Sequence, residues 1–266
     1  MRRTVAAVLA AACAASPPAA LAIEGLPGST WGDLHLDVPS SGSADLILEG
    51  WIRQGVAWAR WGAGETDFLL QTYATLRYKW DSEGLDWNNY LGPGAGLALD
   101  LRAPGGPLVS WGVEYVHQWN DRSGGSQPYT APFMNWYHWW EIRQRDWPGS
   151  TWGDLRWQIP NSGPSNLILQ GWIRQGWVMS WWELGSQTFL LGPYLRLRYN
   201  VDSEGLSWNN TLGPGVGLAV DMDRPRGPLL SCGVEYSWEK ALRAAGGVHR
   251  ATVFVRWYAW WDLLGK

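Results

Sequence analysis

Phe68-Leu-Leu-Gln-Thr-Tyr-Ala-Thr-Leu-Arg-Tyr-Lys-Trp80 is the stretch that defines the fold most clearly. Every second residue, counted from Phe68, is apolar or aromatic apart from Thr72, whereas Arg77 and Lys79 belong to the alternate set. A period of two places neighbouring side chains on opposite faces of a β-strand, unlike the period of roughly 3.6 residues that marks a helix. The stretch therefore predicts a long strand with one apolar face and one polar face.

The same alternation returns along most of the chain. It is present in 30–38, 46–61, 91–101, 108–115 and 133–140, and again in 211–222 and 252–261. Charged residues gather on one face of each predicted strand, and the opposite face is almost free of charge away from its ends. We therefore expect an all-β protein with antiparallel strands, because such sheets can carry a different chemistry on each face.

Two architectures have this two-faced pattern. A soluble β-sandwich buries its apolar faces, whereas a membrane β-barrel turns them to lipid and lines its lumen with polar side chains. The predicted strands exceed the usual length of about five or six residues, and about ten residues suffice for a tilted crossing of the membrane. Aromatic residues such as Trp58, Trp80 and Trp140 lie near strand ends, as in the aromatic girdles of membrane barrels. These features favour the barrel.

By this pattern the mature chain resembles the bacterial outer-membrane β-barrel proteins as a class. The resemblance implies an antiparallel transmembrane barrel in the bacterial outer membrane, in contact with membrane lipid. The last predicted strand departs from the class, because it is followed by Asp262-Leu-Leu-Gly-Lys266 and not by a terminal aromatic residue.

The chain contains an internal duplication. Pro27-Gly-Ser-Thr-Trp-Gly-Asp-Leu34 returns as 148–155, an offset of 148 − 27 = 121 residues. We expect residues 23–266 to form one barrel domain built of two repeats, 27–141 and 148–262. Corresponding turns should lie on the same side of the membrane, which requires an even number of strands per repeat, roughly six each and so about twelve in all. If 30–38 is not a strand, the barrel has about ten.

Targeting and composition narrow the function classes. A short basic region and a small apolar run precede Ala20-Leu-Ala22, so residues 1–22 are predicted to be a signal peptide. The net charge of −3, with 21 Lys+Arg against 24 Asp+Glu, argues against a nucleic-acid partner. Cys13 and Cys232 are the two cysteines and cannot make a disulfide framework. The 23 tryptophans indicate contact with an environment that favours amphipathic rings.

Charged side chains on the polar faces are the first candidate functional group. They face one another across the lumen of a barrel, where an unpaired charge is costly, so we expect them to pair or to be hydrated. The predicted lumen network consists of Glu49, Arg53, Arg77, Lys79, Asp100, Glu114, Arg174, Arg196, Arg198, Asp221, Glu235 and Arg256. The network either lines a narrow, weakly selective pore or fills the barrel as a structural element. The bulky inward-facing Trp51 and Tyr73 favour the filled lumen.

Two duplicated loops, 81–89 and 202–210, are the second candidate. Indole rings stack on sugars, amides hydrogen-bond to them, and carboxylate oxygens are ligands for calcium. The candidate ligand residues are Asp81, Glu83, Trp87, Asn88, Asn89, Asp202, Glu204, Trp208, Asn209 and Asn210. A well-packed turn, in which Gly and Asn adopt special backbone angles, is the competing interpretation.

The sequence predicts a non-enzymatic, porin-like barrel that acts as a narrow channel, or as an anchor or assembly component of the cell envelope. We expect no cofactor, no metal site and no catalytic residues, since neither a Ser/His pair nor a Cys/His cluster can be defended from the spacing. Membrane lipid is the expected partner, with a glycan or lipopolysaccharide as a candidate partner at the outer loops. The alternatives are a soluble, exported, Trp-rich carbohydrate-binding protein and an outer-membrane lipid-modifying enzyme.

Overall fold

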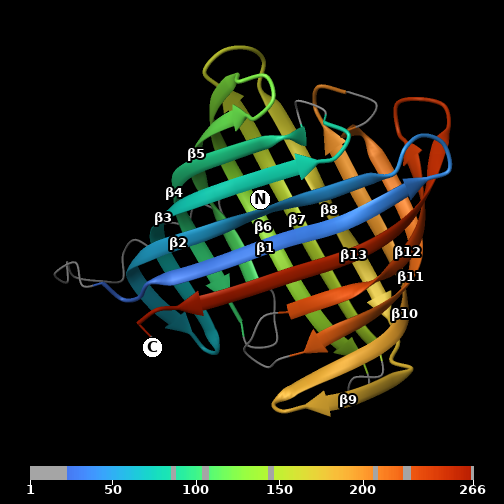
Figure 1. Ribbon diagram of the computed structural model, residues 1–266. Coiled ribbons are helices and arrows are strands. Elements are labelled where there is room, and N and C mark those ends of the chain that lie inside the picture. The colour runs from blue at the N-terminus through green and yellow to red at the C-terminus, as the bar shows by residue number, and fades with distance from the viewer. Residues whose placement is uncertain are drawn as a thin grey trace, which may run out of the picture.

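The computed structural model describes residues 23–84, 88–103, 108–142, 147–205, 209–223 and 229–264. The predicted signal peptide, 1–22, and the loop residues Trp87 and Trp208 lie outside the described residues. The described chain is almost entirely β-structure and forms a barrel (Figure 1). No helix in this part of the chain has the length and hydrophobicity to cross a bilayer. The all-β prediction is confirmed.

The described residues contain thirteen strands. The first half of the chain forms β1 (Pro27–Pro39), β2 (Asp45–Ala63), β3 (Thr66–Asp81), β4 (Tyr90–Arg102), β5 (Leu108–Asn120) and β6 (Ser126–Ile142). The second half forms β7 (Trp147–Pro160), β8 (Asn166–Gly176), β9 (Ser180–Leu184), β10 (Gln187–Asp202), β11 (Thr211–Asp223), β12 (Leu229–Ala241) and β13 (Gly247–Asp262).

Twelve of these strands, all except β9, close into one antiparallel ring. Strands that are adjacent in sequence pair with each other, β8 pairs with β10, and β10 pairs with β11. The first and last strands complete the ring, with Pro27 of β1 opposite Asp262 of β13. The prediction of a twelve-stranded barrel is confirmed, and the stretch 30–38, which decided between ten and twelve strands, lies within β1.

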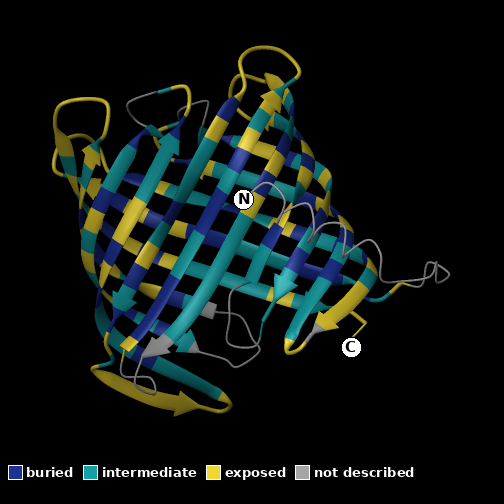
Figure 2. Cartoon of the chain, turned by 180° about the vertical axis from the view of Figure 1, so that it is seen from behind, coloured by how far each residue is buried: buried dark blue, intermediate teal, exposed yellow. Residues whose placement is uncertain are grey.

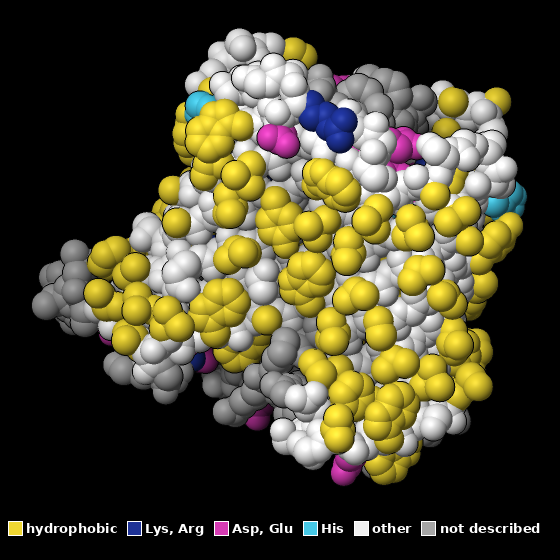
Figure 3. Space-filling model, in the orientation of Figure 1, with side chains coloured by type: hydrophobic (Ala, Val, Ile, Leu, Met, Phe, Trp, Pro, Cys, Tyr) yellow, Lys and Arg dark blue, Asp and Glu magenta, His cyan; other side chains and the backbone are white. Residues whose placement is uncertain are grey.

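The alternation of the sequence is an alternation between lipid and lumen. Leu97 and Val113 point outward and are 45% and 42% exposed, whereas Glu114, the neighbour of Val113, is 1% exposed. Bands of exposed and buried residues alternate along the strands in Figure 2, and apolar side chains cover most of the outer wall in Figure 3. A soluble sandwich requires the opposite arrangement, with Leu97 inside and Glu114 in solvent, so that alternative is wrong.

The two ends of the barrel differ. The chain ends at β1 and β13 and the β2–β3 turn lie at one end, which we call the terminal end; the turns after β1, β3 and β5 lie at the other, the loop end (Figure 1). Exposed tryptophans occur near both, for example Trp61 and Trp147 at the terminal end and Trp80 and Trp119 at the loop end. Such rings at both interfaces anchor a barrel in the bilayer.

β9 was not predicted, and its origin lies in a broken strand. At the 121-residue offset, β2 (45–63) corresponds to 166–184, the combined span of β8 and β9. β2 has a register irregularity between Ala57 and Ala59, and the second copy is irregular at the corresponding place. Residues 177–179 lie outside the strands there, although Trp177 N and Met179 N still donate to Pro193 O and Leu191 O of β10 at 3.1 and 2.9 Å. β9 therefore forms a hairpin with β10 that is separate from β8, and all five of its residues are exposed. The duplication itself stays our interpretation of the sequence.

Candidate functional site

Aromatic side chains meet across the lumen of the barrel. Trp31 of β1 stacks on Trp152 of β7, with ring centroids 4.8 Å apart and an interplanar angle of 4°. Tyr137 of β6 stacks on Tyr258 of β13, again at 4.8 Å and with an angle of 16°. In the ring of twelve strands β1 and β7 are opposite each other, as are β6 and β13, so each stack joins opposite walls. We call these four residues the aromatic layer.

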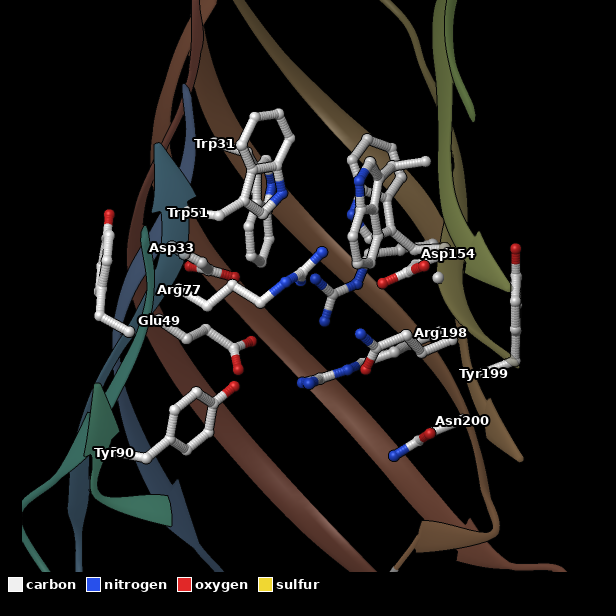
Figure 4. A pocket seen from close by; sticks show the side chains of 17 residues that line it. Trp31, Asp33, Glu49, Trp51, Arg77, Tyr90, Asp154, Arg198, Tyr199 and Asn200 are labelled. Carbon is white, nitrogen blue, oxygen red and sulfur yellow. The ribbon is translucent and has the colours of Figure 1, made fainter. Parts of the chain in front are cut away.

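The two stacks lie side by side, because Trp31 is opposite Tyr258 in the β1–β13 register and Tyr137 is opposite Trp152 in the β6–β7 register. A cavity of about 80 Å³, lined by both tryptophans, lies on the loop-end side of the layer (Figure 4). A smaller one of about 30 Å³, lined by both tyrosines, includes Ser150, two residues nearer the terminal end than Trp152. The aromatic layer therefore lies between the two cavities.

Glu114 is the centre of the charge network in the first half of the chain. Its carboxylate accepts hydrogen bonds from Arg77 Nε at 2.8 Å, Arg156 Nη1 at 2.9 Å and the Tyr73 hydroxyl at 3.0 Å. The Glu114 side chain has no solvent exposure. Three donors, two of them cationic, compensate the loss of water around this carboxylate.

Glu235 occupies the equivalent position in the second half, 114 + 121 = 235. It accepts a hydrogen bond from the Tyr194 hydroxyl at 2.9 Å and pairs with Arg196. Nearby, Arg174 donates to the two carboxylate oxygens of Asp221 from Nη1 at 3.0 Å and from Nη2 at 2.9 Å. This two-point geometry gives the pair orientation as well as charge compensation.

The other predicted network residues also face the lumen. Arg53 donates to the Ser110 hydroxyl at 3.1 Å and lies 4.1 Å from the centre of the Tyr73 ring. Asp100 accepts from Gln71 at 2.6 Å. Lys79 forms an ion pair with Glu49 at 3.4 Å, and Arg256 donates a hydrogen bond to Asp33 at 2.9 Å. Arg198 lines the larger cavity.

The sequence prediction omitted charged residues of β1 and β7. His35 lies between Asp33, at 3.3 Å, and Asp37, at 3.9 Å, and all three are buried. On β7, Arg156 lies 3.4 Å from Asp154 and bridges to Glu114. The signal is present in the sequence, because Asp33, His35 and Asp37 alternate with Leu34, Leu36 and Val38, and the predicted network did not include this polar face.

The two predicted ligand loops use several of their polar groups internally. Asp81 accepts hydrogen bonds from Gly84 N at 2.5 Å and from the Asn89 amide at 3.1 Å, and Asn89 accepts in return from Asp81 N at 3.1 Å. The second loop repeats this pattern. Asp202 accepts hydrogen bonds from Gly205 N at 2.7 Å and from the Asn210 amide at 2.9 Å, and Asn210 accepts from Asp202 N at 3.2 Å. Gly84 and Gly205 have φ values of +79° and +77°, which glycine adopts without strain.

The accessible groups of these loops are fewer than the prediction assumed. Glu83 and Glu204 are exposed, with Glu83 accepting from Ser43 at 2.7 Å, and Asn88 and Asn209 are half-buried. No group of three His, Cys, Asp or Glu side chains in the described residues is placed to hold a metal ion. These contacts favour the interpretation of the described parts of both loops as well-packed turns.

A closed antiparallel barrel with an apolar wall and a charged, hydrogen-bonded interior can satisfy its backbone groups within a lipid bilayer. It is the architecture of bacterial outer-membrane β-barrel proteins, and this protein is one of that class, located in the outer membrane and in contact with its lipid.

No protein-family model and no curated protein sequence matches the chain. Among solved structures, it is similar to the beta domain of the Bordetella autotransporter BrkA, with 12% identity, 87% of this chain and 98% of that chain covered, and a TM-score of 0.46. An outer-membrane channel from Pseudomonas putida F1 is similar at 10% identity, 92% and 99% coverage and a TM-score of 0.46. The KdgM porin is similar at 11% identity, 85% and 98% coverage and a TM-score of 0.36.

Proposed function

We propose that this protein is a non-enzymatic outer-membrane barrel with a closed lumen, which serves as an anchor in the cell envelope and not as an open pore. The supporting observation is the aromatic layer, in which two ring stacks join opposite walls at 4.8 Å. Each stack of this kind contributes roughly 0.5–1.5 kcal/mol beyond the burial of its area. An ion or solute that crosses the lumen has to separate both stacks.

The charge network supports the same proposal. Glu114, Glu235 and Asp221 are all buried in ion pairs, and Arg174 forms its pair in two-point geometry. Charges that bind one another stabilise a filled interior, whereas a conducting pore leaves charged side chains free to exchange with passing ions. The network therefore acts as the filling of the barrel.

The histidine contacts support the non-enzymatic part of the proposal. His35 pairs with two aspartates, His117 packs against Trp119, and His249 contacts Tyr236. Among the described residues, no serine hydroxyl hydrogen-bonds to a histidine, so a Ser/His nucleophile is not assembled there. Turnover of phospholipid by the purified, detergent-folded barrel would contradict the proposal that the protein is not an enzyme.

Planar-bilayer conductance tests the closed lumen. The wild-type protein, inserted from detergent and checked for its heat-modifiable gel shift, is expected to give no steady current. A variant without the layer, Trp31→Ala/Trp152→Ala/Tyr137→Ala/Tyr258→Ala, is expected to conduct. The control variant Trp80→Ala/Trp119→Ala removes two exposed tryptophans of the outer wall and should stay silent.

The two cavities that flank the aromatic layer favour a second candidate, a narrow channel that conducts when the layer separates. The planar-bilayer conductance experiment distinguishes the closed barrel from the narrow channel. Steady, ohmic current through the wild-type barrel would overturn the closed lumen in favour of the channel, and silence of the four-residue variant would show that side chains elsewhere also close the barrel.

A further inference from the structure

Among the described residues that line the larger lumen cavity, one cation has no direct hydrogen bond or ion pair (Figure 4). Its charged lining residues are Asp33, Glu49, Arg77, Asp154, Arg196 and Arg198. The first five are each in an ion pair: with Arg256, Lys79, Glu114, Arg156 and Glu235, respectively. Within the part of the chain that the structure describes, no hydrogen bond or ion pair engages Arg198, and its side chain is exposed to the cavity. The lining thus carries three carboxylates and three guanidiniums, and Arg198 is the one of these six groups without a direct ion pair in the described part of the chain.

The two halves of the chain explain why Arg198 is free. Its counterpart is Arg77, 198 − 121 = 77, which binds the carboxylate of Glu114 at 2.8 Å. The equivalent carboxylate for Arg198 is Glu235, but Arg196 already occupies it. The first half has Thr75 in place of Arg196, which leaves Glu114 accessible to Arg77. In the second half the partner of Glu235 is therefore Arg196 and not Arg198.

The residues opposite Arg198 in the two neighbouring strands are uncharged. Trp172 is opposite Arg198 in the β8–β10 register, and Gln170 is opposite Asn200. All four line the cavity, and the Asn200 side-chain oxygen is buried without a hydrogen-bond partner. The first half has the charged pair Glu49 and Lys79 where the second has Gln170 and Asn200. This wall has therefore exchanged an ion pair for two neutral amides beside a free guanidinium.

The cavity has room for a small ligand and lies toward the loop end of the barrel. Its volume of about 80 Å³ exceeds several times the roughly 10–15 Å³ that one water requires. Tyr90, the first residue of β4, and Asn200, two residues from the end of β10, also line it. Both positions are next to the turns of the loop end, so the cavity extends from the aromatic layer toward that mouth.

We propose that this cavity is a binding site for a small oxyanion, a carboxylate or a phosphate, held by the guanidinium of Arg198 with the amides of Gln170 and Asn200 beside it. A guanidinium presents paired N–H donors that match two oxygens of such an anion. The inference goes beyond the closed lumen and does not depend on it.

Calorimetric titration of the full, detergent-folded barrel tests the site. Inorganic phosphate and, separately, acetate are titrated at constant ionic strength. Saturable one-to-one binding to the wild type is expected, and binding of phosphate alone or of both probes tells a phosphate site from a carboxylate site. Arg198→Gln should weaken binding at least tenfold, Arg198→Lys should restore part of it, and Arg60→Gln, which alters an exposed arginine at the terminal end, should leave it unchanged.

Two further variants test the mechanism without touching Arg198. Arg196→Thr copies the first half and lets Arg198 bind Glu235, so anion affinity should fall at least tenfold. Arg196→Thr/Glu235→Gln removes that charged acceptor, frees Arg198 again and should restore binding. The heat-modifiable gel shift confirms that each variant is folded. Absence of saturable binding to the wild type, or undiminished binding to folded Arg198→Gln or Arg196→Thr, would overturn the proposal.

Discussion

The two halves of the barrel share several charged residues at equivalent positions and pair them differently. Arg174 forms a two-point ion pair with Asp221, whereas Arg53 and Asp100, their counterparts, are not in contact as an ion pair within the described residues. Two neighbouring positions differ: Gln71 donates to Asp100 at 2.6 Å and Arg102 lies 3.6 Å from it, whereas the second half has Gly192 and Asp223 there. We infer that the neighbouring side chains contribute to whether the pair forms.

Glu114 and Glu235 should show the largest difference between the halves. Glu114→Gln leaves the cations of Arg77 and Arg156 without their shared carboxylate, so we expect a loss of about 3–5 kcal/mol in the free energy of unfolding. Glu235→Gln removes the partner of Arg196 and should cost less, because one cation loses its carboxylate there. Urea unfolding in lipid vesicles measures both, and an equal or smaller effect at Glu114 would contradict the comparison.

Asp221 and Asp100 should differ in the same direction by a smaller amount. Asp221→Asn disrupts the two-point pair with Arg174, and we expect it to cost about 2–3 kcal/mol. Asp100→Asn keeps an acceptor for Gln71 and should cost about 1 kcal/mol. The same unfolding assay applies, and the reverse order would show that the second-half pair is no stronger than its counterpart.

Gln71→Ala should make the first half resemble the second. Without the Gln71 amide, Asp100 becomes available to Arg53, as Asp221 is to Arg174. A double-mutant cycle on Arg53 and Asp100 should then give a coupling energy of about 1–2 kcal/mol, against a value near zero in the presence of Gln71. If the coupling stays near zero in the Gln71→Ala background, backbone placement and not Gln71 separates the pair.

The smallest effect is expected at the β2–β3 hairpin. Arg60 pairs with Asp67 at 3.0 Å, but both side chains are well exposed, at 33% and 45%. Arg60→Ala should therefore change the free energy of unfolding by less than about 1 kcal/mol. The second half already has Trp181 at this position, so the barrel tolerates the absence of the pair. A larger loss would mean that the two hairpins contribute unequally to stability.

Much of the fold could be predicted from the sequence, since the period of two assigns every residue of a strand to lipid or to lumen. Leu97 and Glu114 lie on the sides that the alternation predicts. β9 escaped prediction because a strand that breaks in the middle keeps its alternation on both sides of the break. Nothing in the sequence of residues 177–179 marks the irregularity that separates β8 from β9.

The site was less predictable, because contacts across a lumen depend on strand tilt and stagger, which a linear pattern does not contain. The alternation placed Arg174 and Asp221 correctly on the lumen face, but it does not predict that they form a direct ion pair. The stack of Trp31 on Trp152 has a signal that was overlooked. These residues are 152 − 31 = 121 positions apart and face inward from opposite strands, so near a twofold axis each meets its own copy.

The pairing of the first strand with the last has a consequence for biogenesis. β1 and β13 are joined along their length, and Asp262 also accepts a hydrogen bond from Leu26 N at 2.9 Å, across 236 residues of sequence. This seam can seal only after both strands have been exported, because its two sides are the first and last strands of the barrel. Until then the two edge strands of the growing sheet expose unpaired backbone N–H and C=O groups, which can pair with strands of other proteins. We therefore expect that delivery to the membrane requires a chaperone that covers both edge strands until β13 pairs with β1.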